Sequence, residues 1–390
     1  MPTWDFWVEW VIKALISSIA LLTAFAYMTL AERKVAALLQ TRHGPNRVGP
    51  FGFFQPVADG LKLFFKEELI PGGADKPIFI IAPIITVVPA LVILAVVPWG
   101  PKGAVLACCH FEFAFGGQSL AFGQEYFRRV IDLGLADLNV GMLYILSVAS
   151  IAVYGVTLAG WSSNNKYAMM GGIRSSAQMV SYELALGLSV IGPLMLAGSM
   201  SMNDIIVTQG RTWWFVVLQP VAALVFYLAA LAEVNRAPFD MPEAEQELTA
   251  GYVTEYSGMK FALFMMAEYI KMVGVSAIFV TLFLGGWQGP FVQQIPWLGI
   301  GYFWGKVALS LVFMIWLRST HPRLRYDRLM SFGWKFLLPL ALVNVLVTGA
   351  AMVNPTLMWW VMGVLVAAGA ALGLVNLARG RAAAAGRARI

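Results

Sequence analysis

Cysteine, histidine and charge are all scarce in this chain. Its 390 residues include 2 cysteines, 3 histidines and only 12% charged residues. The two cysteines are adjacent, Cys108 and Cys109, so they offer neither a disulfide framework nor the C-x-x-C spacing of a metal site. The histidines stand singly, without a second ligand at a useful spacing. We therefore predict no metal, Fe–S or haem site within this chain.

Apolar side chains are present in excess. Hydrophobic residues make up 59% of the chain and the mean hydropathy is +0.73. A water-soluble domain of this length would not have that composition. Backbone groups in hydrocarbon must find hydrogen bonds within their own segment, which forces helix, and the apolar runs lack the alternation of a β-barrel. The sequence therefore predicts an all-α polytopic membrane protein.

Nine apolar runs have the length of roughly 20 residues that a bilayer crossing requires. These predicted transmembrane helices are 10–30, 77–98, 140–161, 178–199, 213–233, 260–284, 299–318, 335–353 and 357–378. The first run is too long and too early for a cleaved signal peptide. Residues 1–390 are thus interpreted as one integral membrane domain. The region 101–137 and the basic tail 379–390 carry no motif that we can interpret.

Positive charge is distributed unequally between the two sets of connections. Most of the 27 basic residues lie in the connections that follow the odd-numbered runs. The other side holds only Lys102, Arg128, Arg129 and Arg211. Because cytoplasmic loops are enriched in Lys and Arg, we predict a periplasmic N-terminus and a cytoplasmic C-terminus. Abundant Ala and Gly with an Arg-rich tail favour a bacterial inner membrane.

The first of these basic connections contains a predicted amphipathic surface helix at 50–68. Its apolar residues recur near helical spacing, which suits a helix lying along the membrane and facing lipid or a hydrophobic ligand. A plain juxtamembrane anchor is the alternative. The preceding HGPNRVGP stretch favours more than an anchor, because its two Gly-Pro pairs fix a turn that holds Arg42, His43 and Arg47.

Acidic residues gather at one place, the predicted cytoplasmic loop 234–259 and its edges. Seven of the chain's 21 acidic residues lie there: Glu233, Asp240, Glu243, Glu245, Glu247, Glu255 and Glu268. Carboxylates crowded beside a low-dielectric region repel one another, so some of them should have raised pKa values and exchange protons. A solvated acidic loop is the alternative. Against it, Glu243 and Glu247 would share one helical face.

Four stretches resemble one family closely. They read ERKVAALLQTRHGPNRVGPFGFFQPVADGLKLFFKE, GWSSNNKYAMMGGIRSSAQMVSYE, AEVNRAPFDMPEAEQELTAGYVTEYSGMKFALFMMAEY and RSTHPRLRYDRLM. Their content and order resemble the subunit of proton-pumping NADH:quinone oxidoreductase, respiratory complex I, that joins the membrane arm to the peripheral arm. It is known as the H subunit in bacteria and as subunit 1 in mitochondria. The resemblance extends over nearly the whole chain.

The resemblance implies a subunit that contributes to catalysis by the complex without a catalytic residue or cofactor of its own. Quinone would be the substrate of the complex, while Fe–S clusters, FMN and NADH belong to partner subunits. The implied partners are the peripheral-arm Fe–S and hydrogenase-like subunits, small membrane-arm subunits and the lipid bilayer, with no nucleic acid. The residues implied for the quinone tunnel are Glu32, Arg33, Arg42, Phe53, Phe54, Asp59, Lys62, Phe264, Arg318 and Arg323.

A proton path is the second implied feature. In that family an acidic channel couples quinone chemistry to proton movement, and the corresponding residues are Glu183, Glu233, Asp240, Glu243, Glu245, Glu247, Glu255 and Glu268. An ionisable residue within a span is a functional hypothesis by default. For Glu183 a structural hydrogen bond or ion pair, with Arg174 or Lys271 as the partner, is the alternative.

Two other functions remain open from the sequence. The chain could be the equivalent subunit of a membrane-bound hydrogenase-related complex, although the aromatic surface helix favours the quinone enzyme. It could also be a stand-alone ion or solute carrier, for which intramembrane carboxylates would be suitable. The paired Gly/Pro-interrupted spans typical of such carriers are not evident.

Overall fold

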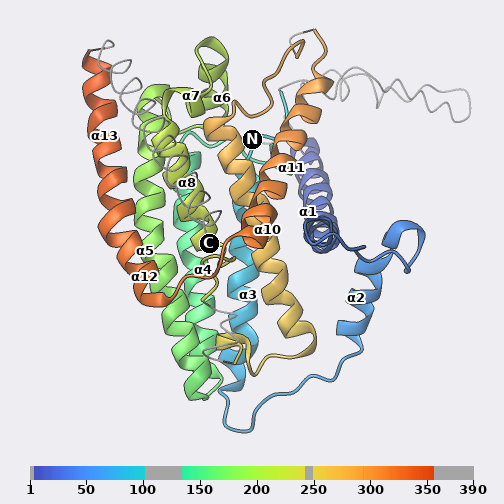
Figure 1. Ribbon diagram of the computed structural model, residues 1–390. Coiled ribbons are helices and arrows are strands. Elements are labelled where there is room, and N and C mark those ends of the chain that lie inside the picture. Colours follow the sequence, from blue (N-terminus) through green and yellow to red (C-terminus); the bar gives the residue numbers. More distant parts are fainter. Residues whose placement is uncertain (1–3, 102–133, 242–248, 293, 355–390) are drawn as a thin grey trace, which may run out of the picture.

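A computed structural model describes residues 4–101, 134–241, 249–292 and 294–354 (Figure 1). Within these ranges all regular structure is helical. Seven of the described helices are long and apolar enough to cross a membrane, and an eighth apolar helix is shorter. The all-α polytopic membrane architecture predicted from composition is confirmed.

The long helices form one bundle. They are α1 (Trp4–Leu39), α3 (Lys76–Ile93), α4 (Gly141–Ser162), α5 (Lys166–Ala197), α8 (Pro220–Glu233), α10 (Gly258–Phe283), α11 (Trp297–Thr320) and α13 (Leu338–Val353). Short elements connect them: η1 (Pro50–Gly52), α2 (Gln55–Phe64), η2 (Leu94–Val96), α6 (Met202–Arg211), α7 (Phe215–Leu218), η4 (Gly251–Val253), α12 (Tyr326–Phe332) and the π-helical turn η5 (Gly333–Leu337).

The helices differ in extent from the predicted runs at several places, including the run 335–353, whose helical segment already begins at Tyr326. α1 continues to Leu39, well beyond residue 30, and α5 already begins at Lys166. The run 213–233 is interrupted at Gln219, which has φ −136° and ψ 63°, because Pro220 has no backbone N–H to continue a helix from α7 into α8. The predicted span 357–378 and the tail lie outside the described residues.

The bundle has a central group of helices with others at its edges. α3, α4, α5, α8 and α10 pack on one another, α1 packs against α10 and α11, and α13 packs against α5 and α8 (Figure 1). Small residues permit the closest crossings. A Cβ on Gly155 of α4 would lie 2.2 Å from Thr86 Oγ1 of α3, and one on Gly171 of α5 would lie 2.6 Å from the Gly251 Cα.

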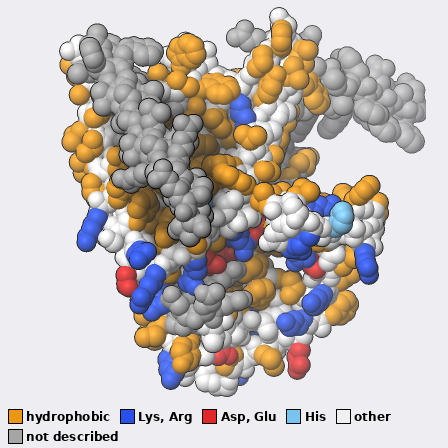
Figure 2. Space-filling model, in the orientation of Figure 1, with side chains coloured by type: hydrophobic (Ala, Val, Ile, Leu, Met, Phe, Trp, Pro, Cys, Tyr) orange, Lys and Arg blue, Asp and Glu red, His pale blue; other side chains and the backbone are white. Residues whose placement is uncertain are grey.

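Connections that are distant in sequence meet at one end of the bundle, which we call the acidic-loop end: residues 65–75, 162–166, 234–241, 249–257 and 320–325. The Asp75 N–H donates to the Ser162 carbonyl over 3.1 Å, and the Leu324 N–H donates to the Pro238 carbonyl over 3.1 Å. The opposite end is formed by residues 198–214, 284–292 and 294–296. In the view of Figure 2, most charged side chains gather in the lower half, where the acidic-loop end lies.

The helix α2 stands beside the bundle, separate from its core (Figure 1). Its apolar side chains Val57, Leu61 and Phe64 are each more than half exposed. The segment is nevertheless attached to α1, since the Phe53 ring lies 4.9 Å from the Tyr27 ring. An exposed apolar stripe beside a membrane bundle is the arrangement expected of a surface helix.

Candidate functional site

Glu32 is a buried carboxylate at the place where α1 extends beyond its predicted length. It is only 8% exposed, and three side chains from other segments contact it. Arg318 of α11 forms an ion pair with its Oε1, and the Tyr269 hydroxyl of α10 donates to its Oε2 over 2.6 Å. Arg236 Nη1 lies 3.9 Å from Oε1. A charge that would be costly in hydrocarbon is thus stabilised by three partners.

Arg236 joins this carboxylate to a second one. Its side chain is buried, and its Nη2 lies 3.5 Å from Oε2 of Glu268 in α10. Its guanidinium carbon stands 4.3 Å from the centre of the Tyr269 ring, in cation–π geometry. One buried guanidinium therefore serves Glu32 and Glu268 at once. Since both carboxylates share this cation, proton occupancy of one depends on that of the other.

The charge continues into the bundle through Lys271. This buried lysine lies almost one helical turn beyond Glu268, and it is within electrostatic range of Glu268, Glu233 and Glu183. Glu233, at the end of α8, is half-buried, and Glu183 of α5 accepts a hydrogen bond from the Ser150 hydroxyl of α4. We call the series Arg318, Glu32, Arg236, Glu268, Lys271, Glu233 and Glu183 the buried ionic network.

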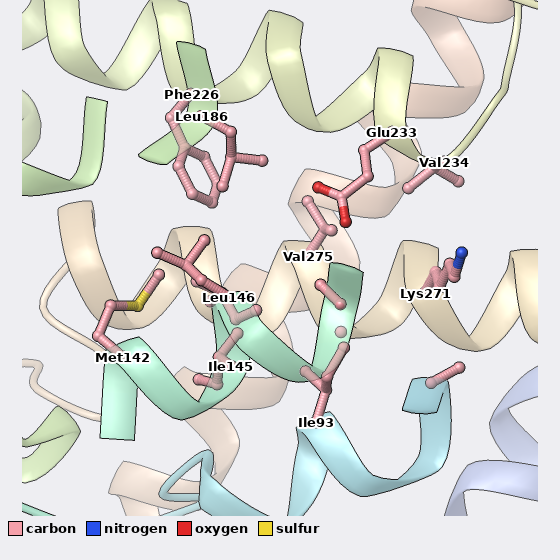
Figure 3. A pocket seen from close by; sticks show the side chains of 14 residues that line it. Ile93, Met142, Ile145, Leu146, Leu186, Phe226, Glu233, Val234, Lys271 and Val275 are labelled. Carbon is pink, nitrogen blue, oxygen red and sulfur yellow. The ribbon is translucent and has the colours of Figure 1, made fainter. Parts of the chain in front are cut away.

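A pocket adjoins this network. The Glu233 carboxylate points into it, and Lys271 stands near the same end (Figure 3). Among the described residues that line it, these two carry the charge, and the remainder are apolar or glycine. Side chains such as Met142 and Phe226 form its far wall. The charged groups thus face a largely apolar space between α3, α4, α5, α8 and α10.

The residues beside α2 form a separate, exposed group. Arg33 Nη1 lies 2.8 Å from Oδ2 of Asp59, whose other oxygen accepts from Gln55 Nε2 over 3.0 Å. The Lys34 ammonium donates to the Phe51 carbonyl over 2.6 Å. Other residues predicted for the quinone tunnel are exposed here too: Arg42, Phe53, Phe54 and Lys62. These contacts fix α2 to the end of α1.

Phe264 belongs to neither group. It is fully buried, with its ring 5.2 Å from that of Tyr252 and 4.9 Å from that of Tyr256. Tyr256 in turn stacks on Phe79 at 4.0 Å. Burial raises the pKa of Tyr256 to about 12, against a smaller lowering by its contact with Ser162, so the hydroxyl stays protonated. This aromatic cluster fastens the start of α10 to α3 and α4.

The other predicted site residues that the structure describes lie at or near the acidic-loop end. Glu255 accepts a 2.7 Å hydrogen bond from the Asn165 side chain, and Arg323 Nη2 lies 3.9 Å from the Met241 sulfur. Asp240 is half-buried. Three predicted residues, Glu243, Glu245 and Glu247, lie outside the described residues.

The structure thus brings together Glu32, Arg318, Glu268, Glu233 and Glu183 from the predicted sets. Sequence analysis did not assign Arg236 and Tyr269 to the site, although they hold its centre. For Arg236 there was a signal: it is a cation within the acidic stretch of a chain with few charges. Tyr269 had no signal beyond its place beside Glu268. In the described part of the chain, no three His, Cys, Asp or Glu residues are arranged to hold a metal ion.

The fold and this network define a class: a polytopic membrane protein with ionisable groups linked inside its helical bundle. Residues 12–349 match the model of the NADH dehydrogenase family. A relative from Geobacter metallireducens, named as the second of its NADH-quinone oxidoreductase H subunits, is 48% identical over 88% of this chain and 95% of its own length. "NADH-quinone oxidoreductase subunit 8" of Thermus thermophilus is 46% identical over 89% and 88%. The chain belongs to the NADH dehydrogenase family, as a membrane subunit of an oxidoreductase complex.

Proposed function

We propose that this subunit couples quinone reduction to proton translocation, and that the buried ionic network is the coupling element. The quinone head group would react near the junction of α1, α2 and the 234–241 turn, where peripheral-arm subunits supply the electrons. Protonation changes at Glu32 and Glu268 would then pass along Lys271, Glu233 and Glu183 toward the remaining membrane subunits.

One observation carries the proposal: Arg236 is shared by two buried carboxylates from different helices. Keeping several ions out of water costs several kcal/mol each, and well-packed apolar residues would serve stability as well or better. Ionisable groups retained inside a membrane bundle are therefore a functional hypothesis by default. Because the groups share partners, a change in charge beside Glu32 alters the proton affinity of Glu268, and so on along the network.

The quinone side of the proposal rests on α2 and the end of α1. An isoprenoid tail would lie against the exposed apolar surface that includes Phe53 and Phe54, and polar groups such as Arg33 and Asp59 would contact its path. Glu32 adjoins this region directly, because it precedes Arg33 in the same helix. The quinone site and the proton path would therefore meet at Glu32.

The charge distribution of the sequence supports a membrane orientation for this subunit. The acidic-loop end would face the cytoplasm and contact the peripheral-arm Fe–S and hydrogenase-like subunits, with the N-terminus in the periplasm. The relatives described above are named quinone oxidoreductases, which favours this function over a hydrogenase-related subunit or a stand-alone carrier. The complex would be located in a bacterial inner membrane.

The deciding experiment replaces Glu268 by Gln in the assembled complex. We expect quinone reduction and the number of protons pumped per quinone to fall, while the amount of complex stays near that of the wild type. The matched control is Asp204→Asn, because Asp204 is an exposed carboxylate of α6 at the opposite end, bonded to Ser199 over 2.8 Å. Unchanged turnover and pumping in Glu268→Gln would exclude Glu268 from the path.

A further inference from the structure

Arg236 lies on a turn, and the turn is held by a side chain from another helix. The turn leaves α8 at Glu233 and includes Asn235, whose φ of 57° is in the left-handed region. The Phe239 N–H donates to the Arg236 carbonyl over 2.9 Å, so the chain folds back on itself. A short non-helical turn of this kind needs support from outside to hold a side chain in a fixed place.

Gln178 of α5 gives that support. It is fully buried, and its amide nitrogen donates to the Ala232 carbonyl over 2.7 Å and to the Phe239 carbonyl over 2.7 Å. The same nitrogen lies 3.3 Å from the Asn235 side-chain oxygen. Its two hydrogens therefore join the residue before the turn to the residue after it. Arg236 lies between these two points.

We propose that Gln178 is a positioning residue for the coupling reaction, acting by holding Arg236 between Glu32 and Glu268. The inference rests on the proposed function, since it gives Gln178 a role only if the Arg236 contacts matter. The chemistry requires a primary amide at this place. A carboxylate would turn oxygen lone pairs toward the two carbonyls. An apolar side chain would leave the Ala232 carbonyl with only local backbone bonds, such as the 3.3 Å bond from the Asn235 N–H. The Phe239 carbonyl would keep only the 3.2 Å bond from the Met241 N–H, so the link that ties the two ends of the turn together would be lost.

The test is Gln178→Met in the assembled complex, a change that keeps the approximate size and removes the donor. We expect kcat for quinone to fall about tenfold, the size expected when two ordinary hydrogen bonds no longer hold the turn. Protons pumped per quinone should fall as well. The pH profile of kcat should move toward that of Arg236→Met, because Arg236 contacts Glu32, Glu268 and Tyr269. The other groups that face these two carboxylates are Arg318, on Glu32, and Tyr252, on Glu268.

Gln209 offers a matched control. It is also a buried glutamine, whose amide donates to the Thr281 carbonyl over 2.8 Å and accepts from the Gly285 N–H over 2.9 Å, but at the opposite end of the bundle. Gln209→Met should lower the amount of assembled complex, with the wild-type pH profile and pumping ratio in what remains. If the two glutamine variants behave alike per assembled complex, Gln178 is merely structural and the inference is wrong.

A second variant tests the role if Gln178→Met assembles poorly, and a double variant tests whether Gln178 acts through Arg236. Gln178→Asn retains the primary amide on a side chain that is one methylene shorter, so it should assemble more readily than Gln178→Met and restore part of kcat, pumping and the pH profile. A loss as large as that of Gln178→Met would refute the need for an amide donor. In an Arg236→Met background, Gln178→Met should add little, since there is no guanidinium to position. If Arg236→Met itself changes nothing, the proposed function fails; if only Gln178→Met is silent, the inference alone fails.

Discussion

Two cations inside the bundle have different surroundings. Arg236, at the acidic-loop end, faces the carboxylates of Glu32 and Glu268. Lys306 of α11 lies toward the opposite end, where its ammonium donates to the carbonyls of Leu284, Gly286 and Gln288 over 2.7, 3.0 and 2.7 Å. It also stands 4.4 Å from the centre of the Trp214 ring.

The partners of the two cations differ in whether they can change protonation state. A carboxylate beside a guanidinium can take up a proton, and this alters the charge that its neighbours experience. A backbone carbonyl has no such second state, so the contacts of Lys306 hold the end of α10 in one arrangement. Under the proposed function, the two ends of the bundle would have different tasks, proton response at one and closure at the other.

The largest expected effect comes from removing the shared cation. Arg236→Met leaves two buried carboxylates without their common partner, and breaking a buried pair costs about 3–5 kcal/mol. We expect the carboxylates to bind protons instead and quinone reductase activity to fall at least about tenfold with loss of pumping. The measurement is NADH:quinone turnover and proton uptake in vesicles, normalised to assembled complex. Normal pumping in this variant would remove the distinction between the two cations.

The sequence predicts much of this difference, but not its geometry. Apolar length gives the helices, because hydrocarbon leaves the backbone no other partner. The same pattern ends the first span too early, because the charges of Glu32 and Arg33 indicate the edge of the membrane. In the structure Glu32 is buried. Its partners are Tyr269, which is 237 residues away in the sequence, and Arg318, which is farther still. Such long-range pairs leave no trace in local periodicity.

The same limit applies to residues whose role comes from the turn they contact. Gln178 looks like an ordinary polar residue at the start of a predicted span. Lys306 lies inside a predicted span, but the sequence does not indicate what it binds. In both cases the bonded carbonyls belong to other segments of the chain. Glu183, Glu233 and Glu268 were predictable for the opposite reason. An acidic residue inside an apolar run is conspicuous in one dimension, and its cost requires a function or a partner.

The next largest effect is expected at Lys306, whose contacts hold the end of α10. Lys306→Met leaves three carbonyls without a charged donor. Hydrogen bonds to charged groups contribute about 1.5–3 kcal/mol each to stability. Removing the ammonium also removes the cost of its desolvation, which offsets part of this loss. We expect the complex to inactivate at a lower temperature in mild detergent, with protons pumped per quinone unchanged. Arg211→Met, at an exposed cation of the same end, should leave both quantities at wild-type values. A changed pumping ratio in Lys306→Met would contradict a closure role.

A smaller effect is expected from a change in helix packing that contacts neither cation, and it shows how a loss of packing alone affects stability and pumping. Gly155→Ala places a methyl group 2.2 Å from Thr86 Oγ1, so α3 and α4 must separate, at a cost of about 1–3 kcal/mol. We expect a lower inactivation temperature with an unchanged pumping ratio. Gly187→Ala is the control, because no atom lies within 4 Å of its added Cβ and stability should be kept. If Gly155→Ala uncouples pumping, then packing loss alone imitates the Arg236 variant.

The smallest effect on stability is expected at the exposed contact between α1 and α2. The side chains of Arg33 and Asp59 are 52% and 33% exposed, and such pairs contribute about 0.2–1 kcal/mol. Arg33→Ala should therefore leave assembly and the pumping ratio unchanged, in contrast to Arg236→Met. If α2 lines the approach of quinone, a loss of about 0.7 kcal/mol would still raise the apparent KM about threefold. Asp59→Asn weakens the same contact by removing the charge of the other partner. In a quinone-concentration series it should give the same raised KM as Arg33→Ala. A wild-type KM in both variants would show that the orientation of α2 does not control quinone entry.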